Sequence, residues 1–293
     1  MSDHLRAWLQ IHFCVLLWGF TAILGKTITL SALPLVWWRM TLVIVALLVV
    51  PGFWRGLAKL SLRQVATFSG IGVVVSLHWL TFYAAIKLSN ASVGATCMAL
   101  SPVFTSIIEP FIAGRRFRPR ELLFGIAVVP GVALVVGGTP TSMRIGIAVG
   151  VISAVFVAIF GSLNKRFVHD GDAITITGLE MAAGAIFLAM LSPLLPKSEY
   201  LFSLPGRQDA ILLLILALGC TLLPFVLSLF SLRHLSAFTT ALAVNMEPVY
   251  SIALAMLLFS EQRELGAAFY AGVAIVLLVV FGHPLIGARQ VRT

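Results

Sequence analysis

The feature that most constrains this chain is a series of about ten continuous apolar stretches, each long enough to cross a bilayer as a helix. A transmembrane helix needs about 20 apolar residues, whereas the strands of a membrane barrel are about ten residues of alternating polarity. The stretches do not alternate, so we expect an all-α integral membrane protein. The expected spans are Trp8–Gly25, Leu33–Pro51, Val65–Ile86, Ala91–Ala113, Glu121–Gly137, Ile145–Leu163, Ala173–Leu194, Ala210–Ser231, Ala237–Phe259 and Leu265–His283.

Composition agrees with a bilayer environment and argues against other partners. Hydrophobic residues make up 60% of the chain and charged residues 11%, whereas soluble domains carry about 25% charged residues. The net charge of +9 would suggest nucleic acid for a soluble protein, but basic loops also orient membrane helices. Cys14, Cys97 and Cys220 lie inside apolar runs and are expected to be small interior residues. We therefore expect no nucleic acid, no cofactor and no metal.

The basic residues also predict the orientation of the chain. Ten spans place both termini on the same side of the membrane. Most lysines and arginines of the loops fall on that side, including the cluster between Arg115 and Arg120. Because cytoplasmic loops are enriched in Lys and Arg, we expect a multi-pass protein of the cell (inner) membrane with both termini in the cytoplasm.

Two stretches near the middle of each half of the chain resemble one another. Residues 90–104 align without gaps on residues 236–250, and the paired prolines Pro102 and Pro248 are 146 positions apart. This match predicts a repeat of two halves, 1–142 and 143–293, with five spans each. An odd number of spans per half makes the second half enter the membrane inverted. Inverted repeats are typical of secondary transporters, which bind substrate near the midplane between the halves.

Several motifs also resemble a known family. They are Trp18-Gly19 in the first span, Pro34 and Arg39 in the second, and the run from Pro248 to Glu261 with its partial counterpart from Pro102 to Arg115. The chain resembles the drug/metabolite transporter (DMT) superfamily of the EamA type, over nearly its whole length. The pattern is most similar to the aromatic amino acid exporter (YddG-like) branch. The acid that the family usually has at the end of this motif is Glu261 here, but Arg115 replaces it in the first half.

The expected substrate site lies where polar groups interrupt the two repeated stretches. Glu247 is halfway along its span, and charged groups inside a bilayer cost on the order of 3 kcal/mol or more. It is therefore a candidate for binding a substrate amino group or a proton, or for a hydrogen bond to a neighbouring helix. Small polar residues at helical spacing suggest the walls of one cavity or ordinary helix packing. The substrate-binding candidates in these stretches are Met98, Ser101, Thr105, Asn245, Glu247 and Ser251.

The third span contributes a histidine beside aromatic residues. His78 is a candidate for binding a substrate carboxylate or for titrating during transport; alternatively it is a hydrogen-bonded interior group. Trp18, Trp79, Phe82 and Tyr83 are candidates for stacking on an aromatic substrate, or for an interfacial belt.

Four further residues are candidates for gating or coupling. Arg39 and Glu180 occupy corresponding places in the second span of each half, and inversion would put them at opposite depths, each near the gate on its own side. A structural ion pair elsewhere is the alternative. Pro102 and Pro248 remove helix hydrogen bonds and are candidates for hinges, or for kinks that serve packing.

Together these residues predict a secondary transporter that exports amino acids, aromatic or other neutral ones, and related small metabolites from the cytoplasm by alternating access. Protons are a candidate coupling ion. The alternatives are an exporter of a different metabolite or drug class and a membrane-embedded enzyme, although the chain lacks the usual hydrolase and nucleotide-binding motifs. Substrate identity and oligomeric state are left open by the sequence.

Overall fold

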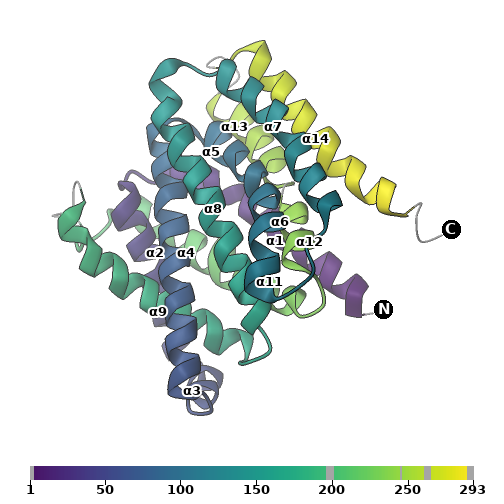
Figure 1. Ribbon diagram of the computed structural model, residues 1–293. Coiled ribbons are helices and arrows are strands. Elements are labelled where there is room, and N and C mark those ends of the chain that lie inside the picture. Colours follow the sequence, from purple (N-terminus) through teal and green to yellow (C-terminus); the bar gives the residue numbers. More distant parts are fainter. Residues whose placement is uncertain (1–2, 196–200, 245, 261–264, 289–293) are drawn as a thin grey trace.

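The computed structural model describes residues 3–195, 201–244, 246–260 and 265–288, and these residues form helices without any strand. Figure 1 shows the helices gathered into one bundle, with the C-terminal helix at its edge. The first half contains α1 (Asp3–Thr27), α2 (Ala32–Leu48), α3 (Pro51–Leu57), α4 (Leu62–Leu88), α5 (Ala91–Cys97), the 3-10 turn η1 (Met98–Leu100), α6 (Ser101–Ala113) and α7 (Pro119–Gly137).

The second half follows after the short 3-10 turn η2 (Thr141–Met143). It contains α8 (Arg144–Phe167), α9 (Ala173–Leu191), the turn η3 (Ser192–Leu194), α10 (Arg207–Leu214), the π-helix η5 (Ile215–Leu222), α11 (Leu223–Leu232), α12 (Ala237–Val244), α13 (Glu247–Phe259) and α14 (Ala267–Ala288).

Seven helical segments of the described residues are long and apolar enough to cross a membrane, and an eighth is obtained if α2 and α3, bent by 91°, count as one span. Large hydrophobic side chains face outward, for example Phe111, which is 82% exposed, and Leu257, which is 81% exposed. Soluble surfaces rarely carry such side chains in number. The all-helical membrane architecture agrees with the sequence, while the total of ten spans stays a prediction.

Two spans are interrupted at corresponding places. The first runs through α5, η1 and α6, and the second through α12 and α13, and each begins, restarts and ends 146 positions apart in the two halves. Each ends at a residue with left-handed backbone, Gly114 (φ 67°) and Ser260 (φ 55°). Pro102 and Pro248 lie in the first turn of the restarted helices, where a missing N–H costs no helical hydrogen bond.

Glycines allow the helices around the core to approach closely. A Cβ on Gly72 of α4 would lie 2.3 Å from the backbone oxygen of Glu180 in α9. A Cβ on Gly272 of α14 would lie 2.3 Å from the backbone oxygen of Gly131 in α7, and Figure 1 shows these two helices side by side. Close backbone contact through small residues is the usual basis of helix packing in membranes. It leaves the interior between α1, α4, α8 and α11 to larger side chains.

Candidate functional site

A cavity of about 120 Å³ lies between the helices of the two halves. One water needs about 10–15 Å³ on this scale, so the cavity has room for several waters or for a small metabolite. Its walls come from both halves: Trp18, Thr21, Arg39, His78, Trp79, Phe82, Met98, Ser101, Thr105, Val157, Phe160, Gly161, Asn164, Phe225, Ser228, Leu232, Ala237, Thr240, Ala241, Val244 and Glu247.

Arg39 of α2 is the cation of this cavity, and it is held in a single orientation. Its side chain is only 2% exposed. Its Nε donates to Thr221 Oγ1 at 2.5 Å and its Nη1 donates to the Tyr83 hydroxyl at 2.9 Å. The guanidinium carbon lies 3.8 Å from the centre of the Trp79 ring, a favourable cation–π distance. Among the described residues Nη2 has no partner, so one donor group is left for a ligand.

A π-helix positions the partner of Arg39. Thr221 lies in η5, and its hydroxyl donates to the Leu216 backbone oxygen, five residues earlier, at 2.6 Å. The same hydroxyl oxygen accepts the bond from Arg39 Nε. The wider turn of a π-helix shifts the side chains that follow it, and such turns are frequent at functional sites. The local backbone of the second half therefore orients a side chain of the first half.

Glu247 supplies an acidic group. It is the first residue of α13 and is 7% exposed. It lines the cavity, and none of the described residues donates a hydrogen bond or forms an ion pair with its carboxylate. A charge without a partner at such a depth is costly. Like Nη2 of Arg39, this carboxylate is left for a ligand.

Aromatic rings form much of the remaining wall. Trp79 packs edge-on against Phe225 with their centres 6.0 Å apart, and Phe225 stacks on Phe160 at 6.5 Å. His78 lies 5.3 Å from the Phe160 ring. These contacts place a broad apolar surface next to the two charged groups.

His78 is fixed from behind by α8. Its Nδ1 lies 3.0 Å from the backbone oxygen of Ser153 and 2.9 Å from the Ser153 hydroxyl, which donates to the His78 backbone oxygen at 2.8 Å. A carbonyl at Nδ1 favours the tautomer that carries its hydrogen there. The hydrogen-bonded interior role that the sequence left open is therefore present, and the ring also lines the cavity.

The structure brings most of the predicted site residues to this cavity. Trp18, Arg39, His78, Trp79, Phe82, Met98, Ser101, Thr105 and Glu247 line it. Tyr83 lies behind Arg39 as its hydrogen-bond partner. Pro102 and Pro248 are the second residues of α6 and α13 and do not line the cavity themselves. Asn245 is outside the described residues.

Ser251 was expected to bind substrate, but it does not line the cavity. Its hydroxyl donates to the backbone oxygen of Gly19 at 2.9 Å, where α13 packs on α1. A Cβ on Gly19 would lie 2.7 Å from the Cβ of Tyr250. The helices are therefore too close at this point to leave a cavity, and Ser251 serves their packing.

Glu180 lies one layer behind the cavity wall. It is fully buried in α9, and its Oε2 accepts from Asn164 Nδ2 at 3.4 Å. Asn164 itself lines the cavity. Phe160, Asn164 and Phe225 were missed from the sequence. Asn164 carried a signal, because it is a polar residue at the end of an apolar span, whereas aromatic residues in a uniformly apolar run do not reveal which way they face.

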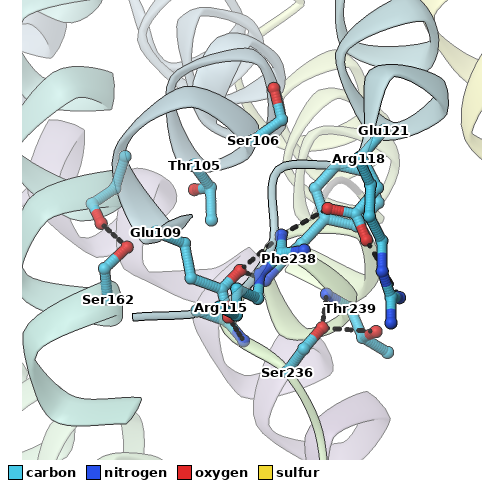
Figure 2. A network of polar contacts seen from close by, with 12 residues as sticks. Thr105, Ser106, Glu109, Arg115, Arg118, Glu121, Ser162, Ser236, Phe238 and Thr239 are labelled. Carbon is cyan, nitrogen blue, oxygen red and sulfur yellow. Dashed lines mark hydrogen bonds and ion pairs between the residues drawn. The ribbon is translucent and has the colours of Figure 1, made fainter. Parts of the chain in front are cut away.

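A polar network lies beside the cavity and links α6 to α12, and Figure 2 shows its side chains. Glu109 of α6 accepts hydrogen bonds from the backbone nitrogens of Ala237 and Phe238 at 3.0 and 2.9 Å, at the start of α12. Arg115 Nη2 pairs with Glu109 Oε2 at 3.0 Å and also with Glu121. Glu109 therefore has Arg115 as a local charge partner and also caps α12 in the second half of the chain.

This network is continuous with the cavity. Thr105 and Ala237 line the cavity, and Glu109 lies one helical turn after Thr105. A carboxylate at a helix N-terminus also interacts favourably with the helix dipole. The network therefore joins α6 to α12 directly beyond the cavity.

Known proteins share this sequence pattern and fold. A relative from Bacillus subtilis (strain 168), described as the uncharacterized transporter YyaM, is 25% identical over 288 residues, covering 92% of this chain and 93% of that protein. A protein of known crystal structure superposes with a TM-score of 0.68 at 17% identity, covering 97% of this chain and 98% of its own, which shows a shared fold.

The family comparison agrees with the relative. The EamA-like transporter family matches residues 6–137 and 144–282. Both findings point to a transporter and confirm the prediction against an enzyme. Because these matches cover well over half of the sequence, the chain belongs to the EamA-like transporter family, within the drug/metabolite transporter superfamily, and is a multi-pass membrane protein.

Proposed function

We propose that this protein exports amino acids, aromatic or other neutral ones, from the cytoplasm across the inner membrane by alternating access. The observation that carries the proposal is that one cavity holds a guanidinium nitrogen of Arg39 and the carboxyl group of Glu247, neither of which has a hydrogen-bond partner among the described residues. A zwitterion offers a carboxylate to the first and an ammonium group to the second. The rings of Trp79, Phe160 and Phe225 would cover its side chain.

The repeated architecture supports alternating access. The family matches each half separately, and the interrupted spans of the two halves begin, restart and end 146 positions apart. We take the halves as 1–142 and 143–293, inverted with respect to one another. The restarts at Pro102 and Pro248 would then be the hinges about which each half moves.

The network of Glu109 supports a gate. It joins α6 of the first half to α12 of the second beyond the cavity. With the termini in the cytoplasm, as the basic loops favour, this network lies on the cytoplasmic side. Its opening would admit substrate from the cytoplasm, and Arg39 would bind substrate on the far side of the cavity, near the opposite gate.

Flux through liposomes tests the proposal. Purified protein is reconstituted into liposomes, which are loaded with labelled phenylalanine. Efflux is then measured with and without competitors, which are unlabelled amino acids and unrelated metabolites. We expect saturable efflux that neutral amino acids inhibit. Efflux that only another class of compound inhibits would assign the exporter to a different metabolite or drug.

Two variants connect the flux to the cavity. Arg39→Lys keeps the charge but loses the fork of donors, and Glu247→Gln removes the carboxylate. A hydrogen bond to a charged group contributes about 1.5–3 kcal/mol, so each variant should weaken substrate binding by roughly 10- to 150-fold. Arg144→Lys and Asp170→Asn are matched controls at exposed positions. Equal affinity in all four variants would refute the zwitterion site.

A further inference from the structure

At the cavity wall, Glu180 and Asn164 form a polar pair that has one hydrogen-bond donor too few. Asn164 Nδ2 donates to Glu180 Oε2 at 3.4 Å. The other oxygen of each side chain, Glu180 Oε1 and Asn164 Oδ1, is buried and has no hydrogen-bond partner among the described residues. Both atoms are acceptors when the acid is ionised. Such a pair leaves two buried oxygens unsatisfied, which is costly.

Among the described residues, no cationic side chain pairs with the Glu180 carboxylate. Glu180 is fully buried, and Gly72 of α4 lies against its backbone. The helices α2, α3, α4, α11 and η3 pack on α9, and Asn164 comes from α8. The ionisable side chains on these elements are bound elsewhere or exposed: Arg39 to Thr221 and Tyr83, His78 to Ser153, Lys87 to Ile28, Lys165 to Leu232 and Arg166 to Ile112, with Arg55, Arg63 and Arg144 exposed.

One added proton supplies the donor that the pair lacks. A protonated carboxyl is a donor as well as an acceptor. If the proton sits on Oε1, it can be donated to Asn164 Oδ1 while Asn164 Nδ2 donates to Oε2, which completes a two-bond acid–amide ring. The same proton removes the buried charge, whose cost is large when no partner is present.

We propose that Glu180 and Asn164 form a proton-binding site, in which Glu180 is protonated in this conformation and Asn164 connects it to the cavity. Asn164 is a wall residue of the cavity. When helix movement admits water, the carboxyl group releases its proton to that water and remains as a carboxylate that the water solvates. Asn164 then faces two acceptor oxygens instead of one, so its amide group turns. Because Asn164 is part of the cavity wall, the wall changes shape when Glu180 loses its proton.

Infrared spectroscopy tests the proton directly, without knowledge of any substrate. The C=O stretch of a protonated carboxyl group absorbs at a frequency separate from the carboxylate and amide bands. This frequency shifts when the protein is transferred to heavy water. We expect such a band in the wild-type protein at neutral pH, its loss in Glu180→Gln, and its persistence in Glu247→Gln. Glu180→Gln retains the ring geometry, since a second amide can donate and accept, so it should fold with an unchanged melting temperature.

Three results would overturn the proposal. One is a wild-type spectrum at neutral pH without a band that Glu180→Gln removes. Another is a band that Glu247→Gln removes instead. The third is stabilisation of the wild-type protein, but not of Glu180→Gln, by sodium at constant ionic strength, because that would assign the site to a metal cation.

A transport measurement then asks whether the proton is used, and only this step rests on the proposed function. With one proton exchanged per substrate, a gradient of one pH unit drives at most about tenfold accumulation. We expect Glu180→Gln to lose this accumulation while it retains substrate exchange at equal pH. Exchange that persists together with full accumulation would show that the site does not couple transport. If the wild-type protein shows no substrate exchange at all, the transport proposal is refuted, while the infrared result on the proton still stands.

Discussion

Replacing Glu109 by glutamine should open the end of the cavity that its network closes. Glutamine keeps one acceptor oxygen, so one of the two backbone N–H groups at the start of α12 loses its partner and the contact with Arg115 loses its charge. A hydrogen bond to a charged group contributes about 1.5–3 kcal/mol, and the helix dipole about 0.3–1 kcal/mol. A loss of about 2 kcal/mol from the closed state multiplies the open population by roughly 30.

Cysteine accessibility measures this population. The three native cysteines are buried and are replaced by alanine, and Thr105→Cys places a thiol in the cavity beside the network. The labelling rate by a membrane-impermeant maleimide, added to the side that carries the loop between α6 and α7, reports how often this end opens. We expect Glu109→Gln to raise the rate by about the same factor of roughly 30.

Glu121→Gln is the matched control. Glu121 pairs with Arg115 and Arg118 in the same network, but among the described residues it accepts no hydrogen bond from α12. Its replacement should change the labelling rate by no more than about fivefold, because an ion pair with partly exposed partners is worth about 1 kcal/mol or less. Equal rates in Glu109→Gln and the parent, in protein with an unchanged melting temperature, would refute the assignment of the network as the closing contact.

Three further substitutions test the packing and the positioning of site residues. Gly72→Ala would place its Cβ 2.3 Å from the backbone oxygen of Glu180, whereas a Cβ on Gly70 would meet nothing within 4 Å; only the first should lower the melting temperature, with a cost of about 1–3 kcal/mol. Thr221→Val removes the acceptor of Arg39 Nε, and should weaken phenylalanine binding by at least about tenfold in equilibrium binding assays with little loss of helix content by circular dichroism. Ser153→Ala leaves His78 Nδ1 its backbone partner at 3.0 Å, so chemical denaturation should show a loss of only about 1 kcal/mol; a loss of several kcal/mol would contradict this account of His78.

The helices were predictable because bilayer insertion demands continuous apolar runs, and those runs are visible in the sequence. The interruptions within the spans were less visible. The 3-10 turn at Met98 and the restart at Glu247 were indicated only by Pro102 and Pro248, which showed where a helix could begin. The π-helix at Ile215–Leu222 had no sequence signal, since it depends on how Thr221 and Arg39 meet in three dimensions.

The site was predicted better in the first half than in the second. Arg39, His78 and Glu247 stand out because polar groups are rare in apolar spans. Phe160 and Phe225 do not, because an aromatic residue in a membrane helix faces lipid, a neighbour or a cavity with the same sequence pattern. Ser251 shows the opposite error, since helical spacing placed it on the face of Glu247 while close packing against Gly19 directs it to α1.

In the proposed repeat, the pair Arg39 and Glu180 would favour one conformation. Each is the eighth residue of its helix, in α2 and α9 respectively, yet Arg39 is held by two hydrogen bonds and a ring, and Glu180 by one amide. If the two halves exchange shapes during transport, these positions exchange surroundings, and unlike charges make the two end states unequal in energy. A proton on Glu180 changes that inequality, whereas Arg39 stays charged at all accessible pH values. The balance between the end states should therefore shift with pH more in the wild-type protein than in Glu180→Gln. The labelling rate at Thr105→Cys reports this balance when it is divided, at each pH, by the rate of the same thiol in unfolded protein, because the reactive thiolate fraction also changes with pH.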